Sequence, residues 1–324
     1  MRLSEGHTLI IEARDAGFFS NFNGVVNNLC HRLGRDGVEA ISVEWRADPE
    51  KRGFCYGNPE DGNVWLHFFE PLPFPADPAP RQLARGYADL GMTHRFAYAM
   101  YKLNRTWRRR YHAVYQRYIR VRPAILERVA AIHREGMAGR YCIGVHYRHP
   151  AHDKECMDPI PTPETFIVRL RAMLPANREW AVVLATDVES VVTAFRDAFG
   201  SRLVLQPAVL RGEGFSGGDP HEEADTPGLA RGEQVLIDCL LLAKCDALLH
   251  VTSNLVTAAG YINPNMKMVY CESVGQAVRG YWWSATRAPV ALSYHPNTLP
   301  VAVGGTLRQI HRLYRMLAGR PGTA

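Results

Sequence analysis

The sequence lacks the segments that would carry it into or across a membrane. Its 324 residues contain no apolar run near the roughly 20 residues that span a bilayer. The first residues, MRLSEGHTLIIEARD, carry a charge every few positions and have no apolar core of signal-peptide length. We therefore expect a cytoplasmic protein, which could still touch a membrane from outside as a peripheral contact.

Cysteine motifs are missing as well. The seven cysteines are an odd number, and no two of them form a CxxC pair. Several lie inside apolar runs such as CLLLAKC (239–245). This usage favours reduced, mostly buried thiols and argues against a disulfide framework.

Two common nucleotide-binding signatures are absent. There is no glycine-rich P-loop, which removes the signature of kinases and ATPases, and GFFSNFNG (17–24) has the wrong spacing for GxGxxG. The chain also contains no internal repeat and no low-complexity tract. Neither signature therefore points to a nucleotide site in this chain.

What is present is the composition of a soluble globular protein. Hydrophobic residues make up 47% and charged residues 22% of a chain long enough for one large or two ordinary domains. The net charge of +6 suits an anionic ligand or an acidic membrane surface, but it identifies neither.

Strand and helix patterns alternate along most of the chain. We expect strands at 7–13, 37–45, 141–147, 180–186, 201–207, 247–253 and 267–273, helices at 19–33, 162–174, 187–200, 232–246 and 254–261, and mostly helix over 84–136. Such alternation predicts an α/β fold with parallel sheets covered on both faces. We expect two Rossmann-like domains facing a cleft. The N-terminal acceptor-side domain spans 1–140; the C-terminal nucleotide-sugar domain spans 141–324, with a last helix that could pack back on the first.

Polar side chains gather where three strands of the second half end. These residues are His146, Arg148, Thr186, Asp187, Thr252 and Ser253. The helix expected to begin near Arg231 and Gly232 adds backbone amides, which bind phosphate because their N–H groups are unpaired and lie at the positive end of the helix dipole. Arg148 could add bidentate contacts to the same anion. The layout is that of a nucleotide or nucleotide-sugar site.

Each of these residues also has a purely structural interpretation. Asp187, Thr252 and Ser253 could simply cap the helices that follow them. Asp238 could be a solvent-facing residue of an otherwise apolar helix, and a strand-end arginine is more often a surface ion pair than a ligand group. The functional interpretation depends on their coincidence at neighbouring strand ends.

The stretch YCIGVHYRHPAHDKEC (141–156) contains several residue types that bind metals. Its spacing matches neither HExxH nor a zinc finger, and Arg148 and Lys154 would repel a cation. We therefore interpret it as an anion site followed by a catalytic loop.

A second cluster, RTWRRRYHAVYQRYIRVRP (105–123), is basic with interleaved aromatics and could bind nucleic acid. Its aromatic and aliphatic residues recur at helical spacing, which predicts a packed stripe on one face and a solvated basic face on the other. That face could still meet an anionic acceptor or lipid head groups.

Four blocks of the chain resemble the fucosyltransferase superfamily of GT-B architecture, above all the α-1,6-fucosyltransferases with their bacterial nodulation-type members. GVHYR (144–148) resembles the family's H-x-R strand, and LATDVESVVTAF (184–195) resembles its A-[ST]-D-D block. The segment 229–255 resembles its R-G…D…S-S block, and 17–37 loosely resembles its N-terminal glycine-rich turn and helix. Residues 50–135 match nothing in the family.

The resemblance implies GDP-fucose as donor, inversion at the sugar carbon, a glycan or glycoconjugate acceptor, and neither metal nor cofactor. It puts the pyrophosphate-binding arginine on Arg148, where a fixed cation would stabilise the leaving GDP. It puts donor contacts on His146, Asp187 and Ser253, with Arg231 and Asp238 in matching places. The further substrate-binding candidates are Thr252, from the strand-end layout, and His149, Gly17 and Asn21.

The chain departs from the family where catalysis should occur. His149 stands where the family has a second arginine, and Val188 replaces the second Asp of the A-[ST]-D-D block. The general base is one of Glu155, Asp153 and His152, in that order of similarity, because the acceptor hydroxyl must lose a proton. Three alternatives stay open: a same-fold transferase for another nucleotide sugar, an inactive nucleotide- or carbohydrate-binding protein, and a nucleic-acid binder using 105–123.

Overall fold

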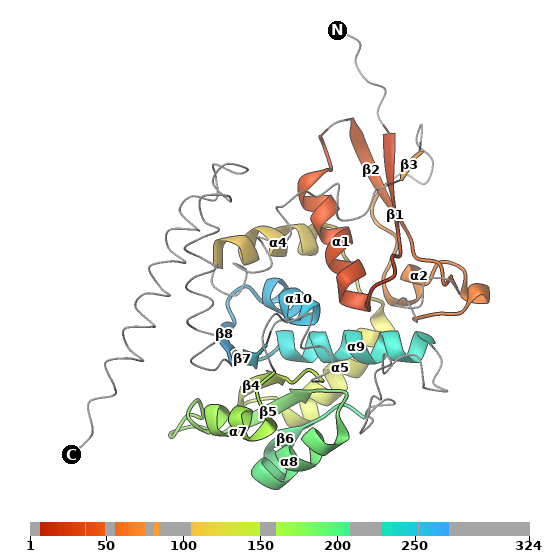
Figure 1. Ribbon diagram of the computed structural model, residues 1–324. Helices are drawn as coiled ribbons and strands as arrows, with labels where there is room; N and C mark the ends of the chain where they lie inside the picture. The colour runs from red at the N-terminus through yellow and green to blue at the C-terminus, as the bar shows by residue number, and fades with distance from the viewer. Residues whose placement is uncertain are drawn as a thin grey trace.

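The structure is a computed structural model that describes residues 7–35, 37–48, 56–74, 81–83, 105–149, 160–207, 228–251 and 253–271. Two all-parallel sheets organise these residues. Figure 1 shows the sheets at opposite ends of the molecule with a layer of helices between them. The predicted α/β alternation is confirmed over this part of the chain.

The first sheet has the order β2-β1-β3, with β1 at His7–Glu12, β2 at Val38–Glu44 and β3 at Arg81–Leu83. Helix α1 (Phe18–His31) makes the crossover from β1 to β2. The short helices η1 (Pro59–Asp61) and α2 (Trp65–Phe68) follow β2. An aromatic cluster joins α1 to this region, since Phe18 packs edge-on against Trp45, Tyr56 and Phe68.

The second sheet has the order β6-β5-β4-β7-β8. Its strands are β4 (Tyr141–His146), β5 (Trp180–Ala185), β6 (Leu203–Val204), β7 (Ala247–His250) and β8 (Lys267–Tyr270). Strands β4, β5 and β7 are buried along nearly their whole length, which explains their continuous apolar runs.

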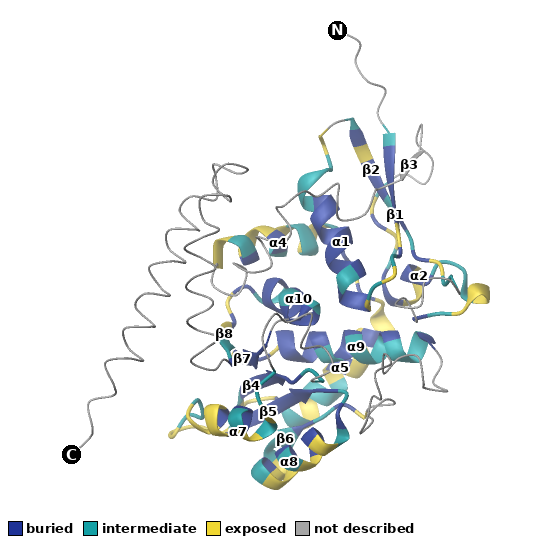
Figure 2. Cartoon of the chain, in the orientation of Figure 1, coloured by how far each residue is buried: buried dark blue, intermediate teal, exposed yellow. Residues whose placement is uncertain are grey.

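Helices cover both faces of the second sheet. On one face, Ile143 and Val145 of β4 pack with α7 (Pro163–Arg171) and α8 (Glu189–Phe199), which η4 (Gly200–Arg202) follows. On the other face, Cys142 joins a core that includes α9 (Gly228–Ala243) and α10 (Asn254–Ile262). This core continues through α4 (Arg105–Tyr118), α5 (Pro123–Gly136) and α1 to the first sheet. Figure 2 shows α1 and α10 as the most deeply buried helices of the layer.

Local signals set the ends of several helices. Thr162 caps α7 by accepting a hydrogen bond from the Thr165 backbone N–H, and Pro163 is the first residue of that helix. Gly200 ends α8 with φ of +53°, and Gly139 follows α5 with φ of +76°, a backbone region that favours glycine.

Three boundary predictions need correction. Helix α9 begins at Gly228 in the described chain, so Arg231 and Gly232 lie inside its first turns and not at its start. Strand β6 covers only Leu203–Val204 of the predicted strand 201–207. The N-cap of α8 is Val188, one residue after Asp187.

Some predictions fall outside the described residues. The helical prediction for 84–104 and the proposed last helix are among them. The division into domains 1–140 and 141–324 also stays a prediction. Helices α4 and α5, which precede that boundary, pack against α10 and α9 of the second half.

Candidate functional site

The candidate site lies at the carboxyl edge of the second sheet. Numbered within this sheet, the strand order is 3-2-1-4-5, so the chain moves outward from β4 to β5 and β6 and then returns to place β7 on the other side of β4. In such sheets ligands bind outside the carboxyl ends of the strands, at the point where the order reverses. That point is the shared end of β4 and β7.

Three of the predicted residues lie at the end of β4. His146 is its last residue and is 8% exposed; Arg148 and His149 follow and are half-buried. Because side chains alternate along a strand, His146 lies on the same face as Cys142, toward α9 and α10. Arg148 and His149 follow β4 at the point where the strand order reverses, and a partly exposed cation at this position can bind an anionic ligand.

Gly144 lets α9 approach this face. A Cβ at that position would lie 2.8 Å from Leu242 Cδ2 and 3.1 Å from Leu248 Cδ1. These contacts are shorter than packed carbons adopt, so a larger residue would push α9 away from β4. The glycine of the GVHYR block therefore has a packing role beneath the site.

The structure adds a residue that the sequence interpretation missed. His250 ends β7 and is the register partner of His146 across the strand pair. It is fully buried, its Nδ1 lies 3.0 Å from the Val251 carbonyl oxygen, and its ring packs edge-on against Tyr270. In the sequence the two histidines are far apart, and only the pairing of two predicted strands could have indicated that they are neighbours.

The end of β5 separates the roles of two neighbouring polar residues. The Thr186 hydroxyl oxygen accepts a hydrogen bond from the Val188 backbone N–H at 3.3 Å, and Thr186 is buried. Asp187 is half-buried, and no side-chain cap bond closes the N-terminus of α8. The interpretation of Asp187 as a helix cap is therefore wrong, and its carboxylate is available at the edge of the sheet.

The end of β7 confirms the structural interpretation of Ser253. Its hydroxyl oxygen accepts a hydrogen bond from the Leu255 backbone N–H at 3.2 Å, which makes it the N-cap of α10. Ser253 is 7% exposed. A cap does not exclude a ligand contact, because the hydroxyl hydrogen can still donate.

Helix α9 carries Arg231, Gly232 and Asp238. A Cβ at Gly232 would lie 2.2 Å from Phe68 Cζ, so the glycine makes room for a fully buried ring of α2. The Asp238 carboxylate accepts a 2.8 Å hydrogen bond from the Gln206 side chain, whose nitrogen also donates to the Gln234 carbonyl oxygen at 2.7 Å. Asp238 thus holds the chain that follows β6, and the view of it as merely solvent-facing is wrong.

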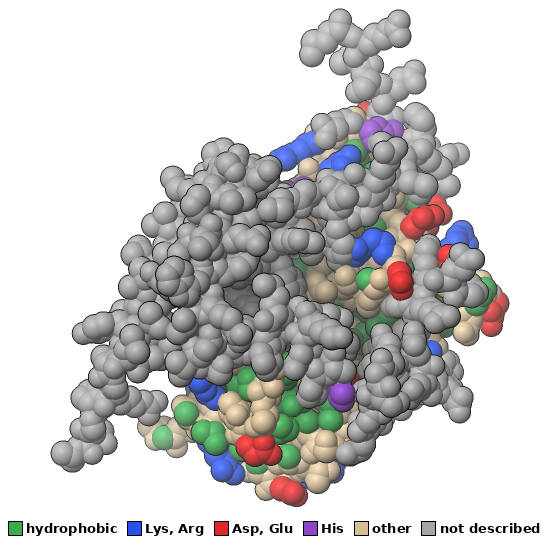
Figure 3. Space-filling model, viewed as in Figure 1, with side chains coloured by type: hydrophobic (Ala, Val, Ile, Leu, Met, Phe, Trp, Pro, Cys, Tyr) green, Lys and Arg blue, Asp and Glu red, His purple; other side chains and the backbone are tan. Residues whose placement is uncertain are grey.

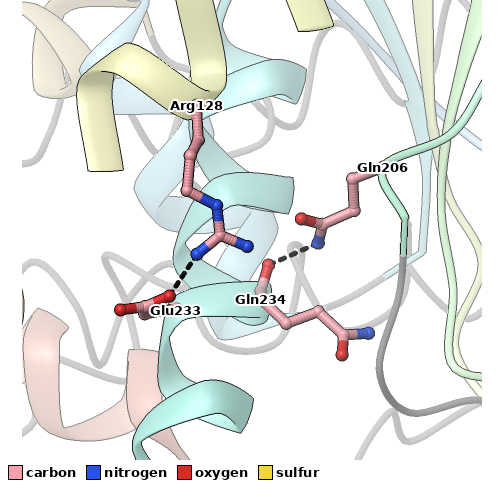
Figure 4. A network of polar contacts seen from close by, with 4 residues as sticks. All are labelled: Arg128, Gln206, Glu233 and Gln234. Atoms are coloured by element: carbon pink, nitrogen blue, oxygen red, sulfur yellow. Dashed lines mark hydrogen bonds and ion pairs between the residues drawn. The ribbon is translucent and has the colours of Figure 1, made fainter. Parts of the chain in front are cut away.

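Figure 4 shows this contact between Gln206 and the Gln234 backbone, together with an ion pair that joins Arg128 of α5 to Glu233 of α9. Both side chains of that pair are well exposed, at 50% and 38%. The pair therefore lies on the outside of the helix layer.

The β1–α1 turn contains Gly17 and Asn21. The Asn21 carboxamide oxygen accepts from the Arg14 backbone N–H at 2.8 Å, and its nitrogen donates to the Ala16 carbonyl at 2.7 Å. Longer bonds reach the carbonyls of Arg14 and Gly17. Asn21 is 2% exposed, so its side chain closes its own turn.

Other predicted residues lie outside the described part of the chain. They are Asp153, Glu155, His152 and Thr252. Within the described ranges, no group of three or more His, Cys, Asp or Glu side chains is arranged to hold a metal. No described helix is long and apolar enough to cross a membrane.

Described cysteines are free, and Cys142, Cys239, Cys245 and Cys271 are buried, as the sequence predicts. Burial, with a smaller effect of the Asp246 carboxylate, raises the pKa of the Cys142 thiol to about 11. Burial also raises the pKa values of Cys239 and Cys245. These thiols stay protonated near neutral pH, so they are poor nucleophiles.

The basic helix α4 is packed as predicted, with one correction. Tyr111 is buried in the layer, while Arg109, Arg110 and Arg117 are exposed. Arg108 does not belong to the solvated face, because it is 7% exposed and donates to the Met266 carbonyl oxygen at 2.8 Å. On the face of the molecule in Figure 3, the described acidic and basic side chains are scattered among uncharged ones.

The fold defines an α/β protein with a Rossmann-like parallel sheet. No family model and no curated protein matches the chain. Solved structures do match. A NodZ α-1,6-fucosyltransferase soaked with GDP-fucose is 18% identical over 80% of this chain and 93% of its own, with a TM-score of 0.51.

Two structures of fucosyltransferase NodZ from Bradyrhizobium are similar to the same degree. One is 21% identical over 79% of this chain and 92% of its own, with a TM-score of 0.50. A selenomethionine form is 19% identical over 84% and 96%, with a TM-score of 0.52. The chain therefore has the GT-B fold of these fucosyltransferases, which confirms the predicted fold class.

Proposed function

We propose that this protein is a metal-independent, inverting glycosyltransferase that transfers fucose from GDP-fucose to a glycan or glycoconjugate acceptor. The observation that carries the proposal is the position of His146 and Arg148. His146 ends the central strand β4 and Arg148 follows it, at the reversal of strand order in a fold like that of NodZ structures, one of which was soaked with GDP-fucose.

Cleavage of the bond between the sugar and the diphosphate is favoured by a cation at this position. An acceptor hydroxyl oxygen attacks the sugar C1 from the face opposite the diphosphate, the bond from C1 to the β-phosphate oxygen breaks, and its electron pair goes to the leaving GDP. Negative charge therefore grows on the β-phosphate as the bond breaks. Arg148 would stabilise that charge, and a guanidinium can do so through two parallel hydrogen bonds.

The other residues at the edge would bind the donor. His146 and Ser253 lie beside the reversal point, and Asp187 could accept hydrogen bonds from sugar or ribose hydroxyls. His149 follows Arg148 at this edge, and Thr252, which precedes Ser253 in the sequence, stays a prediction. On α9, Arg231 would add a second cation, and Asp238 would act through the Gln206 contact that fixes the chain after β6.

On the acceptor side, Gly17 and Asn21 shape the β1–α1 turn. We propose Glu155 or Asp153 as the base that removes the acceptor proton, because a carboxylate within hydrogen-bond reach is needed for that step. The free, buried cysteines support a reducing compartment, and we propose that the protein acts in the cytoplasm.

Thermal unfolding with a panel of nucleotides tests the proposal directly. GDP and GDP-fucose should raise the melting temperature by several degrees, since a ligand at 100 times its Kd stabilises by about 2.7 kcal/mol. UDP, CMP and their sugars should shift it less. A larger shift with UDP or CMP would reassign the donor, and no shift with any nucleotide would overturn the proposal.

One observation favours a second candidate. His149 stands where related enzymes carry a second arginine, which is consistent with a protein that binds the nucleotide sugar without turning it over. Release of GDP from GDP-fucose separates the two functions: turnover supports the transferase, and binding without turnover supports the second candidate.

A further inference from the structure

Buried hydrogen bonds between helices, which we call the polar seam, join the two halves of the chain inside the helix layer. The seam consists of Asn23 and Asn27 of α1 with their partners on α10 and α4. Helix α1 of the first half buries Asn23 at 4% exposed and Asn27 at 5% exposed, and both side chains bond to residues of other helices. In Figure 1 α1 and α10 lie beside each other between the sheets, and the two helices are in contact. Asn23 is the part of this seam nearest the candidate site.

The Asn23 carboxamide uses both of its ends on α10. Its nitrogen donates to the Asn254 backbone oxygen at 3.0 Å and lies 3.3 Å from the Asn254 side-chain oxygen. Its oxygen accepts a hydrogen bond from the Tyr261 hydroxyl at 2.8 Å. One side chain of α1 therefore forms hydrogen bonds with the first residue of α10 and with a tyrosine two turns later.

The direction of side chains on a helix explains how one carboxamide reaches both. Residues seven apart lie on the same helix face, about 10 Å apart along the axis. The side chain of Tyr261 leans toward the helix N-terminus, which carries its hydroxyl back toward Asn254. Burial raises the pKa of Tyr261 well above its usual value, so the hydroxyl keeps the proton that it donates.

Helix α4 fixes the other end of α10. The His112 ring nitrogen Nδ1 lies 2.9 Å from the Tyr261 backbone oxygen. On α1, Asn27 accepts from the Tyr111 hydroxyl, and His31 contacts that hydroxyl at 3.0 Å. Helices α1, α4 and α10 thus form one hydrogen-bonded unit.

We infer that Asn23 is a positioning residue for the donor site: it sets the place of the first turn of α10, and with it Ser253, relative to the acceptor-side helix α1. The inference rests on the proposed function. Asn23 lies two residues after Asn21, which closes the β1–α1 turn, so a single helix links the acceptor-side turn to the donor edge. Asn23 acts through α10 and touches neither the donor nor the reacting atoms.

Helix α1 offers a matched control. Asn28 is also buried, at 5% exposed, but its carboxamide nitrogen donates to the Gly24 carbonyl oxygen of its own helix at 2.9 Å. Replacement of Asn28 removes a buried carboxamide without cutting a bond to α10. Asn23→Ala and Asn28→Ala therefore differ in whether α10 loses its anchor.

The test measures the Kd of GDP by calorimetry, and KM and kcat with GDP-fucose, at a temperature where every variant is folded. Asn23→Ala should raise the Kd of GDP and the donor KM about tenfold with kcat within threefold, because a displaced α10 weakens donor binding before the chemical step. Asn28→Ala should change each value less than twofold. Tyr261→Phe should lie between them, because it frees only the oxygen of the Asn23 carboxamide.

Equal effects of Asn23→Ala and Asn28→Ala on donor KM, or no effect of Asn23→Ala, would overturn the inference. Failure of the proposed function would look different, because the wild-type protein itself would then bind no GDP, and the positioning role would fall with it. A double-mutant cycle of Asn23→Ala with Tyr261→Phe tests the seam separately. It should show a coupling of about fivefold in the unfolding equilibrium constant.

Discussion

Helix α1 and the carboxyl edge of the second sheet both carry polar side chains in partly or fully buried positions, but they use them differently. The four buried asparagines of α1 are bonded to named protein atoms (Asn21, Asn23, Asn27 and Asn28). At the sheet edge, Arg148, His149 and Asp187 are half-buried and lie where parallel sheets bind ligands. We infer that the polar groups of α1 hold the fold together and that those at the edge serve chemistry.

The difference shows that a polar side chain near a site can be fully occupied by hydrogen bonds that hold the fold. Asn21 and Arg148 each follow the first strand of a sheet, and the sequence predicts that both bind substrate. The structure turns the Asn21 carboxamide back into its own turn, whereas Arg148 keeps part of its surface exposed. Substitutions in α1 should therefore mainly lower stability, whereas substitutions at the sheet edge should mainly lower activity.

Alkaline pH should have the largest effect on stability, and it should act through three tyrosines of the helices α4 and α10 that pack around α1. Burial raises the pKa values of Tyr111, Tyr115 and Tyr261 above the usual value of 10. The folded state therefore holds protons that the unfolded chain loses, so stability is fully present below pH 10 and falls as the pH rises above it. The loss is about 1.4 kcal/mol per pH unit for each tyrosine.

Tyrosinate absorbance at 295 nm and the melting temperature, followed together from pH 8 to 12, check this effect. We expect three of the 14 tyrosines to ionise only as the protein unfolds. Ionisation of every tyrosine near pH 10 in a protein that is still folded would contradict the burial of these three tyrosines in the helix layer.

Asn21→Ala should have the largest effect among single substitutions in this region. It removes two short hydrogen bonds and leaves the Arg14 N–H and the Ala16 carbonyl without their partner, at a cost of about 3 kcal/mol. Urea unfolding measures the loss. The rate of sugar transfer, measured per folded molecule, should fall much less than the fraction of folded protein does. A large rise in donor KM with unchanged stability would show that Asn21 binds substrate directly.

Gly232→Ala should destabilise the contact between α9 and α2. The new Cβ would overlap the buried Phe68 ring, and overpacking of about 3 kcal/mol outweighs a gain of about 1 kcal/mol in helix propensity. Gly24→Ala in α1 is the matched control, because its Cβ meets only Arg14 Nη2 at 4.0 Å. We expect Gly24→Ala to be neutral or stabilising, and equal losses for both would show that the close approach of Phe68 has no cost.

Arg128→Ala should have the smallest effect. Its ion pair with Glu233 joins α5 to α9 on the exposed side of the layer, and such pairs contribute less than about 1 kcal/mol. Thermal unfolding at low and high salt should show little difference between the variant and the wild type. A loss comparable to that of Asn21→Ala would mean that the surface contacts of the layer matter as much as its buried seam.

Local signals made much of the fold predictable. The Thr162 cap, the Pro163 start and the Gly200 stop depend on neighbours in the chain, and each lies where the sequence indicates. The polar residues at the ends of β4, β5 and β7 could be found because parallel strands end at one edge. The fold class follows from the same alternation.

Contacts between distant segments were not predictable. Asn23 meets Asn254 across 231 positions, and His146 meets His250 through strand pairing. The burial of Arg108 also had no local signal, since its sequence neighbours Arg109 and Arg110 are exposed. A side chain's role in such contacts depends on which elements pack together, and the pattern of one segment does not contain that information.

The most direct test of the central claim is the rate of GDP-fucose turnover by Arg148→Ala. If Arg148 stabilises the charge on the leaving diphosphate, turnover at saturating donor should fall about 100- to 1000-fold, as it does when other enzymes lose a donor to the transition state. The melting temperature should stay within a degree or two, because Arg148 is only half-buried at the sheet edge. Turnover within twofold of the wild-type rate would contradict the account.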